Sequence, residues 1–125
     1  MKKSPITTHV LNTATGKPAK GIPVTLLHRT FQAKSPSKYR EGSISVEWEE
    51  IGSGKTDADG RLMNWLPKGF KLKRGIYEIT FDLGSYLKKG FYPEATVVFE
   101  VSNAKQHYHV PLLLSPYGYS TYRGS

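Results

Sequence analysis

The sequence predicts an all-β fold, an antiparallel sandwich or barrel assembled from many short strands. Apolar and polar residues alternate with a period of two, most cleanly over residues 77–83, as expected of a strand with one buried face. Turn-forming residues separate such segments at 15–18, 57–60 and 73–75 and mark where strands end. Short strands divided by frequent turns favour a β-sandwich over a helical fold.

Seven segments have the alternation or composition expected of strands. In the third of them, Ile44, Val46 and Trp48 alternate with polar residues. The polar stretch 33–42 contains Pro and Gly and indicates a long hairpin loop. One short helix is expected over residues 85–89, between two glycines. We expect strands, in chain order, over residues 7–12, 23–31, 43–48, 77–83, 96–101, 108–114 and 117–124.

The chain has 125 residues and a mass of 14.0 kDa, which predicts one domain over residues 1–125. Hydrophobic residues make up 38% of it, enough for a packed core. Cysteine is absent, which excludes disulfides, thiolate nucleophiles and Cys-ligated zinc. No signal peptide is expected, and no apolar run approaches the ~20 residues of a membrane span. We expect a cytoplasmic domain without membrane contacts, with the peroxisome as the alternative compartment.

The charge balance is basic. Eighteen Lys and Arg against 10 Asp and Glu give a net charge of +8, which favours anionic partners. The basic residues are dispersed, and the stripe of cations and stacking aromatics that binds nucleic acid is missing. We therefore expect a solvated basic surface or an anionic small-molecule substrate, and no nucleic-acid partner.

Two short segments resemble parts of a phosphate-binding loop and a calcium-binding loop, but each lacks residues that the motif requires. Residues 52–56 read like the end of a phosphate-binding loop, but Glu49 stands where the first glycine is needed and a turn follows instead of a helix. Residues 57–60 imitate part of a calcium loop, but Lys55 and Leu66 would occupy its first and last ligand positions. A hairpin turn explains both segments, and we expect neither a metal nor another cofactor.

Histidines are the residues most able to carry chemistry near neutral pH. His107 and His109 lie two apart on a predicted strand and therefore share a face. Such a pair suits a metal site, a proton shuttle or a merely polar surface. His9 lies on another predicted strand and joins the pair only if the two strands converge.

Several motifs together resemble the transthyretin-related family. The resemblance rests on the opening run from His9 through Ala19, the Thr-Asp-Ala-Asp-Gly-Arg turn at 56–61 and the Phe-Tyr-Pro-Glu loop at 91–94. The His-Tyr-His-Val-Pro run at 107–111 and the final Tyr-Arg-Gly-Ser are similar to the 5-hydroxyisourate hydrolase branch of that family. The resemblance covers nearly the whole chain.

This resemblance implies a transthyretin-like sandwich of two four-stranded sheets with one short helix, assembled as a homotetramer around a central channel. It also implies hydrolysis of 5-hydroxyisourate to 2-oxo-4-hydroxy-4-carboxy-5-ureidoimidazoline in urate degradation, at a site in the channel and without a cofactor. The alternative is a non-catalytic carrier that binds a hydrophobic anion in the same channel. The connection over residues 30–42 is longer than is usual in the family.

The resemblance also implies a set of site residues. His9, Arg61 and His109 are the expected catalytic residues. Either histidine suits the role of the base that activates water, and Arg61 keeps its charge and suits a developing oxyanion. The expected substrate-binding residues are His9, Arg61, Tyr122, Arg123, Gly124 and Ser125.

Overall fold

The computed structural model describes residues 3–35 and 43–125, and the described part is built from strands and turns. The predicted all-β class is therefore confirmed. In the described part no helix is long and apolar enough to cross a membrane. The strands, in chain order, are β1 (Ile6–Asn12), β2 (Lys17–Pro18), β3 (Pro23–Ser35), β4 (Ser43–Lys55), β5 (Arg61–Leu62), β6 (Gly75–Asp82), β7 (Glu94–Val101), β8 (Tyr108–Ser115) and β9 (Gly118–Thr121).

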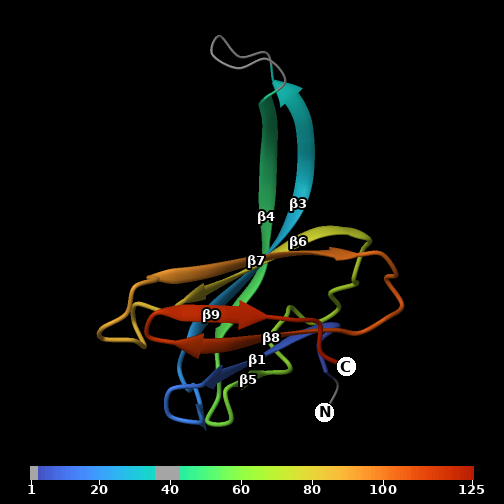
Figure 1. The fold of residues 1–125 in the computed structure, drawn as a ribbon. Coiled ribbons are helices and arrows are strands. Elements are labelled where there is room, and N and C mark those ends of the chain that lie inside the picture. Colours follow the sequence, from blue (N-terminus) through green and yellow to red (C-terminus); the bar gives the residue numbers. More distant parts are fainter. Residues whose placement is uncertain (1–2, 36–42) are drawn as a thin grey trace.

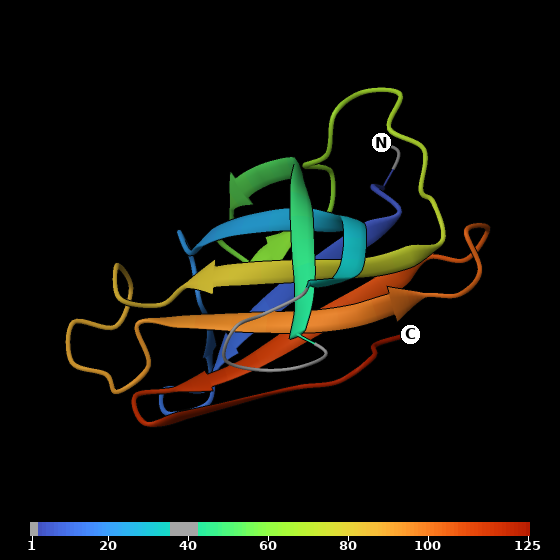
Figure 2. The same cartoon turned by 90° about the horizontal axis from the view of Figure 1, so that it is seen from above.

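The strands form two sheets that face each other as layers of a sandwich (Figures 1 and 2). One sheet has the order β4-β3-β6-β7, with antiparallel neighbours throughout. The other has the order β2-β1-β8-β9, and β5 also pairs with β1. This second sheet has five strands rather than the expected four, because the two-residue strands β2 and β5 share one edge of β1. It is also not purely antiparallel, since β1 and β8 run parallel.

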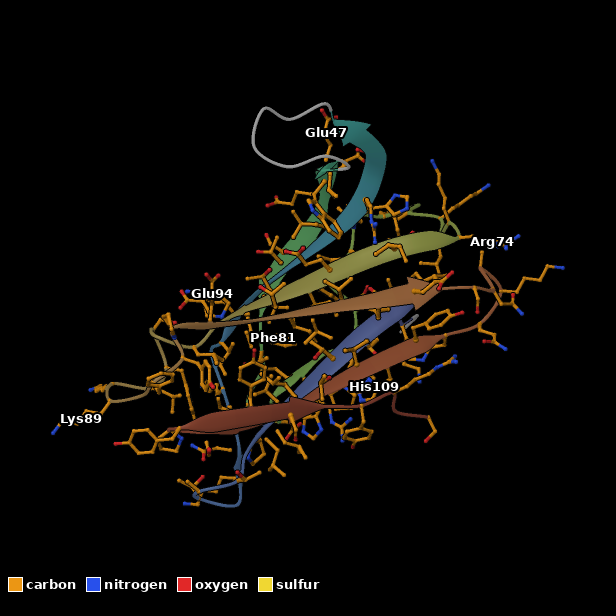
Figure 3. All side chains as sticks on the ribbon, turned by 45° about the horizontal axis from the view of Figure 1, so that its top comes forward. Glu47, Arg74, Phe81, Lys89, Glu94 and His109 are labelled. Carbon is orange, nitrogen blue, oxygen red and sulfur yellow. The ribbon has the colours of Figure 1, made fainter. Side chains whose placement is uncertain are left out.

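The core lies between the two sheets. On β1 the residues Ile6, Thr8 and Val10 are buried on the inward face, and on β8 the same face carries Tyr108 and alternate residues after it. Figure 3 marks Phe81 in the region between the sheets. This alternation leaves the odd-numbered positions of β1 and β8 pointing away from the core. The fully buried large side chains are Tyr77, Phe81, Ile6, Ile22, Leu26, Ile79, Leu83, Leu112, Leu114, Val10, Val24 and Val101.

Residues 85–89 do not form the short helix that the sequence predicted. The backbone makes one turn there, in which the N–H groups of Tyr86 and Leu87 donate to the Leu83 carbonyl at 3.1 and 2.8 Å. Five residues between two glycines are too few to repay the cost of starting a helix. The prediction of one short helix is therefore wrong.

The β3–β4 hairpin extends further than the sequence indicated. Residues 33–35 belong to β3 rather than to the predicted loop, and β4 runs from Ser43 to Lys55. The rest of that predicted loop, residues 36–42, lies outside the described residues. Figure 1 shows the outer half of the hairpin projecting beyond both sheets, away from β1, β5 and β8. The predicted strand at the C-terminus is shorter, since β9 ends at Thr121 and only an isolated bridge follows.

Candidate active site

The outward face of β1, β5 and β8 carries the residues on which the candidate site is built. In the register, His9 lies opposite Arg61 on β5, and Thr7 lies opposite His109 on β8. Directly paired residues project on the same side of a sheet. His9, Arg61 and His109 therefore share one face although they come from three separate segments of the chain. Figure 3 shows His109 on β8, beside β1.

A tight turn before β5 fixes the position of Arg61. The Oδ1 atom of Asp57 accepts the N–H groups of Asp59 and Arg61, each at 2.9 Å. Gly60 adopts a φ of +74°, in the left-handed region that favours glycine. Its carbonyl oxygen accepts the Val10 N–H at 2.7 Å, which ties the turn to β1. The turn therefore holds the Arg61 backbone while its side chain stays exposed.

The hydroxyl of Thr7 joins the two C-terminal histidines. Its Oγ1 atom lies 2.8 Å from Nδ1 of His109 and 3.0 Å from Nε2 of His107. The two rings are nearly parallel, with an interplanar angle of 18° and centroids 6.5 Å apart. Although Thr7 points away from the core, its exposed fraction is 0%. It is thus a buried polar residue whose hydroxyl is hydrogen-bonded to imidazoles.

The surroundings of His109 favour its neutral form. Burial lowers the pKa of this imidazole, and electrostatic repulsion from His107, His9, Arg61 and Lys3 lowers it further. The pKa of His107 is lowered by burial and by Lys3. Both effects act against the protonated ring, since burial disfavours a charge and a nearby cation repels a second one. A neutral histidine beside several cations can accept a proton and bind an anion.

The end of the chain returns to His109. After β9 the backbone bridges back to β8, and the Gly124 N–H donates to the His109 carbonyl at 2.8 Å. A Cβ atom on Gly124 would lie 2.5 Å from Cδ2 of His109 and 3.3 Å from Cγ of Pro111. The close approach of this segment therefore requires a glycine.

The other expected tail residues take different positions. The Arg123 guanidinium lies 4.4 Å above the Tyr108 ring and donates to Oε1 of Gln106 at 3.2 Å. Tyr108 faces the core, so Arg123 projects on the opposite side of the sheet from the His109 ring. Tyr122 is 56% exposed, and Ser125 is exposed at the chain end.

The structure thus brings His9, Arg61, His109 and Gly124 together and directs the Arg123 guanidinium elsewhere. It adds Thr7 to the site, a residue that sequence reasoning did not consider. The available signal was its spacing, since Thr7 lies two residues before His9 on a predicted strand and shares its face. Within residues 3–35 and 43–125, no group of three or more His, Asp or Glu side chains is placed to hold a metal ion.

Two relatives of this sequence match it over nearly its whole length. It is 39% identical over 128 residues to the 5-hydroxyisourate hydrolase of Mus musculus, covering 99% of this chain and 98% of that protein. It is 38% identical over 125 residues to the Uric acid degradation bifunctional protein TTL of Arabidopsis thaliana, covering 98% of this chain and 38% of that protein. The chain thus spans nearly the whole of the first relative and a little over a third of the second.

Solved structures give the same relationship. The fold is similar to that of Klebsiella pneumoniae 5-hydroxyisourate hydrolase, with a TM-score of 0.70, 28% identity and coverage of 96% of this chain and 98% of the other. It is also similar to sea bream transthyretin in complex with thyroxine, with a TM-score of 0.75, 27% identity and coverage of 97% and 95%. The model of the HIUase/Transthyretin family matches residues 6–124. The chain therefore belongs to the HIUase/Transthyretin family.

Proposed function

We propose that this protein hydrolyses 5-hydroxyisourate to 2-oxo-4-hydroxy-4-carboxy-5-ureidoimidazoline, a step of urate degradation. The observation that carries the proposal is the shared outward face of His9, Arg61 and His109, three residues that a water-dependent ring opening needs. Relatives and a solved structure named 5-hydroxyisourate hydrolase support hydrolase activity. The positive charge around the site suits an anionic substrate.

The reaction opens a cyclic amide with water. A neutral imidazole takes a proton from water as the oxygen adds to the carbonyl carbon, and the carbonyl oxygen gains negative charge. His109 or His9 supplies that base, and Arg61 offers guanidinium donors to the oxyanion. The C–N bond then breaks, and the leaving nitrogen receives the proton that the imidazole took. The imidazole is regenerated in each turnover, and because hydrolysis changes no oxidation state the scheme requires no redox partner.

The C-terminal tetrapeptide completes the proposed site. Gly124 fixes the tail against His109, and Tyr122 and Ser125 belong to the same short segment and are exposed. We assign them contact with the substrate ring and the exclusion of water. Arg123 anchors the tail through Tyr108 and Gln106, and its expected role in substrate binding acts through that anchor.

The protein is proposed to act as a homotetramer with the site in a channel between subunits. The outward face that carries the histidines also carries Leu11 and Leu113, which pair with each other across β1 and β8 and are only half-buried. Apolar side chains beside a polar site are suited to cover by another subunit. Similarity to 5-hydroxyisourate hydrolase and transthyretin structures supports this arrangement. Sedimentation equilibrium measures the mass of the assembly directly.

An assay tests the proposal. 5-Hydroxyisourate is prepared from urate with urate oxidase, and its decay is followed by absorbance with and without the protein. We expect faster decay, and loss of the acceleration in both His9→Ala and His109→Ala. His28→Gln is the matched control, because His28 stacks on Tyr77 at 4.4 Å in the other sheet. Decay at the uncatalysed rate with folded wild-type protein would overturn the proposal.

A carrier is the second candidate, favoured by the similarity to the transthyretin–thyroxine complex. A carrier would bind a hydrophobic anion without accelerating the decay of 5-hydroxyisourate. Calorimetric titration with thyroxine tests it on the same preparation. Binding without catalysis would establish the carrier, and catalysis that depends on His9 and His109 would exclude it as the main function.

A further inference from the structure

The Thr7 hydroxyl lies between two imidazoles in a residue that is fully buried. Its Oγ1 atom is 2.8 Å from Nδ1 of His109 and 3.0 Å from Nε2 of His107, and the residue is completely buried. The parallel pairing of β1 and β8 sets Thr7 opposite His109. His107 approaches from the residues just before β8. Two strands far apart in the sequence therefore create this bridge.

A hydroxyl in this position constrains the protons of both rings. Within the described residues the two imidazoles are the only hydrogen-bond partners of this buried hydroxyl. Its one hydrogen is therefore donated to one ring, and its oxygen accepts an N–H from the other. A neutral imidazole carries its proton on one nitrogen only. If Thr7 donates to Nε2 of His107, that ring is protonated at Nδ1, and His109 must also be protonated at Nδ1. In the reverse arrangement both rings are protonated at Nε2. The tautomers of the two rings therefore always match.

We propose that Thr7 is a positioning residue for the hydrolysis, and that its hydroxyl holds His109 in the tautomer with a free Nε2 lone pair. This inference rests on the proposed function, because only a base that activates water needs that lone pair. Within the described residues, Nε2 of His109 has no hydrogen-bond partner in the protein. It is therefore available to a water molecule on the outward face.

The same bridge relays the proton that His109 takes from water. When Nε2 gains that proton, the Nδ1 proton passes to Oγ1 of Thr7 and the hydroxyl proton passes to Nε2 of His107. Thr7 gains one proton and loses one, and the positive charge moves to His107. The reverse transfers return the proton to His109, which then delivers it to the leaving nitrogen. Each transfer runs along a hydrogen bond already present.

The charges around the pair are consistent with this use. The charged and titratable groups acting on the two imidazoles are Lys3, His9 and Arg61, and all of them carry or can carry positive charge. Burial and Lys3 lower the pKa of both rings, and His107, His9 and Arg61 lower the pKa of His109 further, so the neutral form of each ring is favoured. A proton that the relay places on His107 is therefore held only weakly, which allows it to return to His109 within the same turnover.

Two substitutions and two readouts test the inference. Thr7→Val removes the hydroxyl at nearly constant volume, and Thr7→Ser restores it. The ring nitrogen chemical shifts of His107 and His109, measured by NMR at pH 7.5 in full-length protein labelled with nitrogen-15, report the tautomers. We expect both wild-type rings to be protonated at Nδ1. We expect Thr7→Val to break the match and lower kcat at least tenfold, with KM little changed. Thr7→Ser should restore both the match and most of kcat.

Three outcomes separate the alternatives. Different tautomers on the two wild-type rings, or Thr7→Val protein with wild-type kcat, would overturn the role of Thr7 while leaving hydrolysis intact. Matched rings protonated at Nε2 would overturn the assignment of the free Nε2 lone pair. Matched rings in a protein that does not hydrolyse 5-hydroxyisourate would overturn the proposed function and, with it, the catalytic use of the bridge.

Discussion

Gly124 packs against the ring of His109 so closely that a Cβ atom there would lie 2.5 Å from the ring's Cδ2 atom. The ring has little freedom to yield, because its Nδ1 atom is hydrogen-bonded to Thr7 and its backbone carbonyl accepts the Gly124 N–H. Contact with Gly124 and the hydrogen bond to Thr7 together restrict how the imidazole can be oriented on the outward face.

Gly124→Ala is expected to reduce kcat/KM at least tenfold with little loss of stability. The added methyl group must displace either the His109 ring or the tail, and the backbone of the tail beyond β9 pairs with β8 only at one isolated bridge. Steady-state assays and thermal unfolding followed by circular dichroism measure the two effects. Gly118→Ala is the matched control, since its Cβ would make an ordinary contact of 3.7 Å with Ser115. Equal activity in the two variants would contradict this role of Gly124.

Gly60→Ala is expected to destabilise the protein more than Gly16→Ala. Both glycines have nearly the same left-handed backbone, with φ of +74° and +73°, so each substitution costs about 1–2 kcal/mol of backbone strain. A Cβ on Gly60 would also meet the Val10 carbonyl oxygen, whereas one on Gly16 would have nothing within 4 Å. Urea unfolding of both variants isolates the cost of that contact. Equal losses in the free energy of unfolding would show that the turn before Arg61 shifts to accommodate the added methyl group.

Arg61→Ala is expected to lower kcat by about 10²–10³, the effect of removing one oxyanion donor. The backbone at this position is held by Asp57 through its N–H group, so the fold of the turn does not depend on the side chain. Arg61→Lys keeps the charge without the planar fork of donors and should recover only part of the rate. Arg74→Ala, in the loop before β6, is the control. Near-normal turnover of Arg61→Ala would exclude Arg61 from the chemistry.

Activity is expected to persist into mildly acidic solution. A base must be neutral to act, and the pKa of His109 lies below the ordinary value of about 6.5. The acidic limb of kcat/KM should therefore have its midpoint below that pH. Lys3→Gln removes a cation that lowers the pKa of both His107 and His109, so the midpoint should move to higher pH. Lys89→Gln, on a distant loop (Figure 3), should not move it.

Local alternation of apolar and polar residues predicted most strands because each of those strands has one face in the core. It could not predict which strands pair. The parallel pairing of β1 and β8 depends on residues about 100 positions apart, and nothing in either segment encodes it. The strands β2 and β5 have two residues each, too few for any periodicity to be visible. The predicted helix at 85–89 failed because a glycine-flanked segment that short forms only a turn.

The sequence predicted only part of the candidate site's membership and not its geometry. The motifs of the family indicated His9, Arg61 and His109, and the pairing of β1 with β5 and β8 then gathered them. Thr7 was not predicted as a site residue, because threonine is common on strands and its sequence neighbours give it no special role. Its importance arises only from the two imidazoles that a second strand brings to it. The Arg123 guanidinium, by contrast, turns toward Tyr108 and Gln106, which hold it by a cation–π contact and a hydrogen bond.

Shortening the β3–β4 hairpin is expected to leave catalysis unchanged. Beyond His28, β3 pairs with β4 but no longer with β6, and the projecting half lies away from β1, β5 and β8 (Figure 1). Replacing residues 30–47 with an asparagine–glycine turn would keep the Arg29–Trp48 pair, which also makes a cation–π contact of 5.6 Å. Activity assays and sedimentation of the shortened protein measure the effect. Because the site of one subunit lies on the other sheet, a loss of activity would mean that the hairpin acts on a neighbouring subunit of the proposed tetramer. If the shortened protein assembles less well but recovers full activity at high protein concentration, the hairpin contacts the neighbouring subunit outside the site.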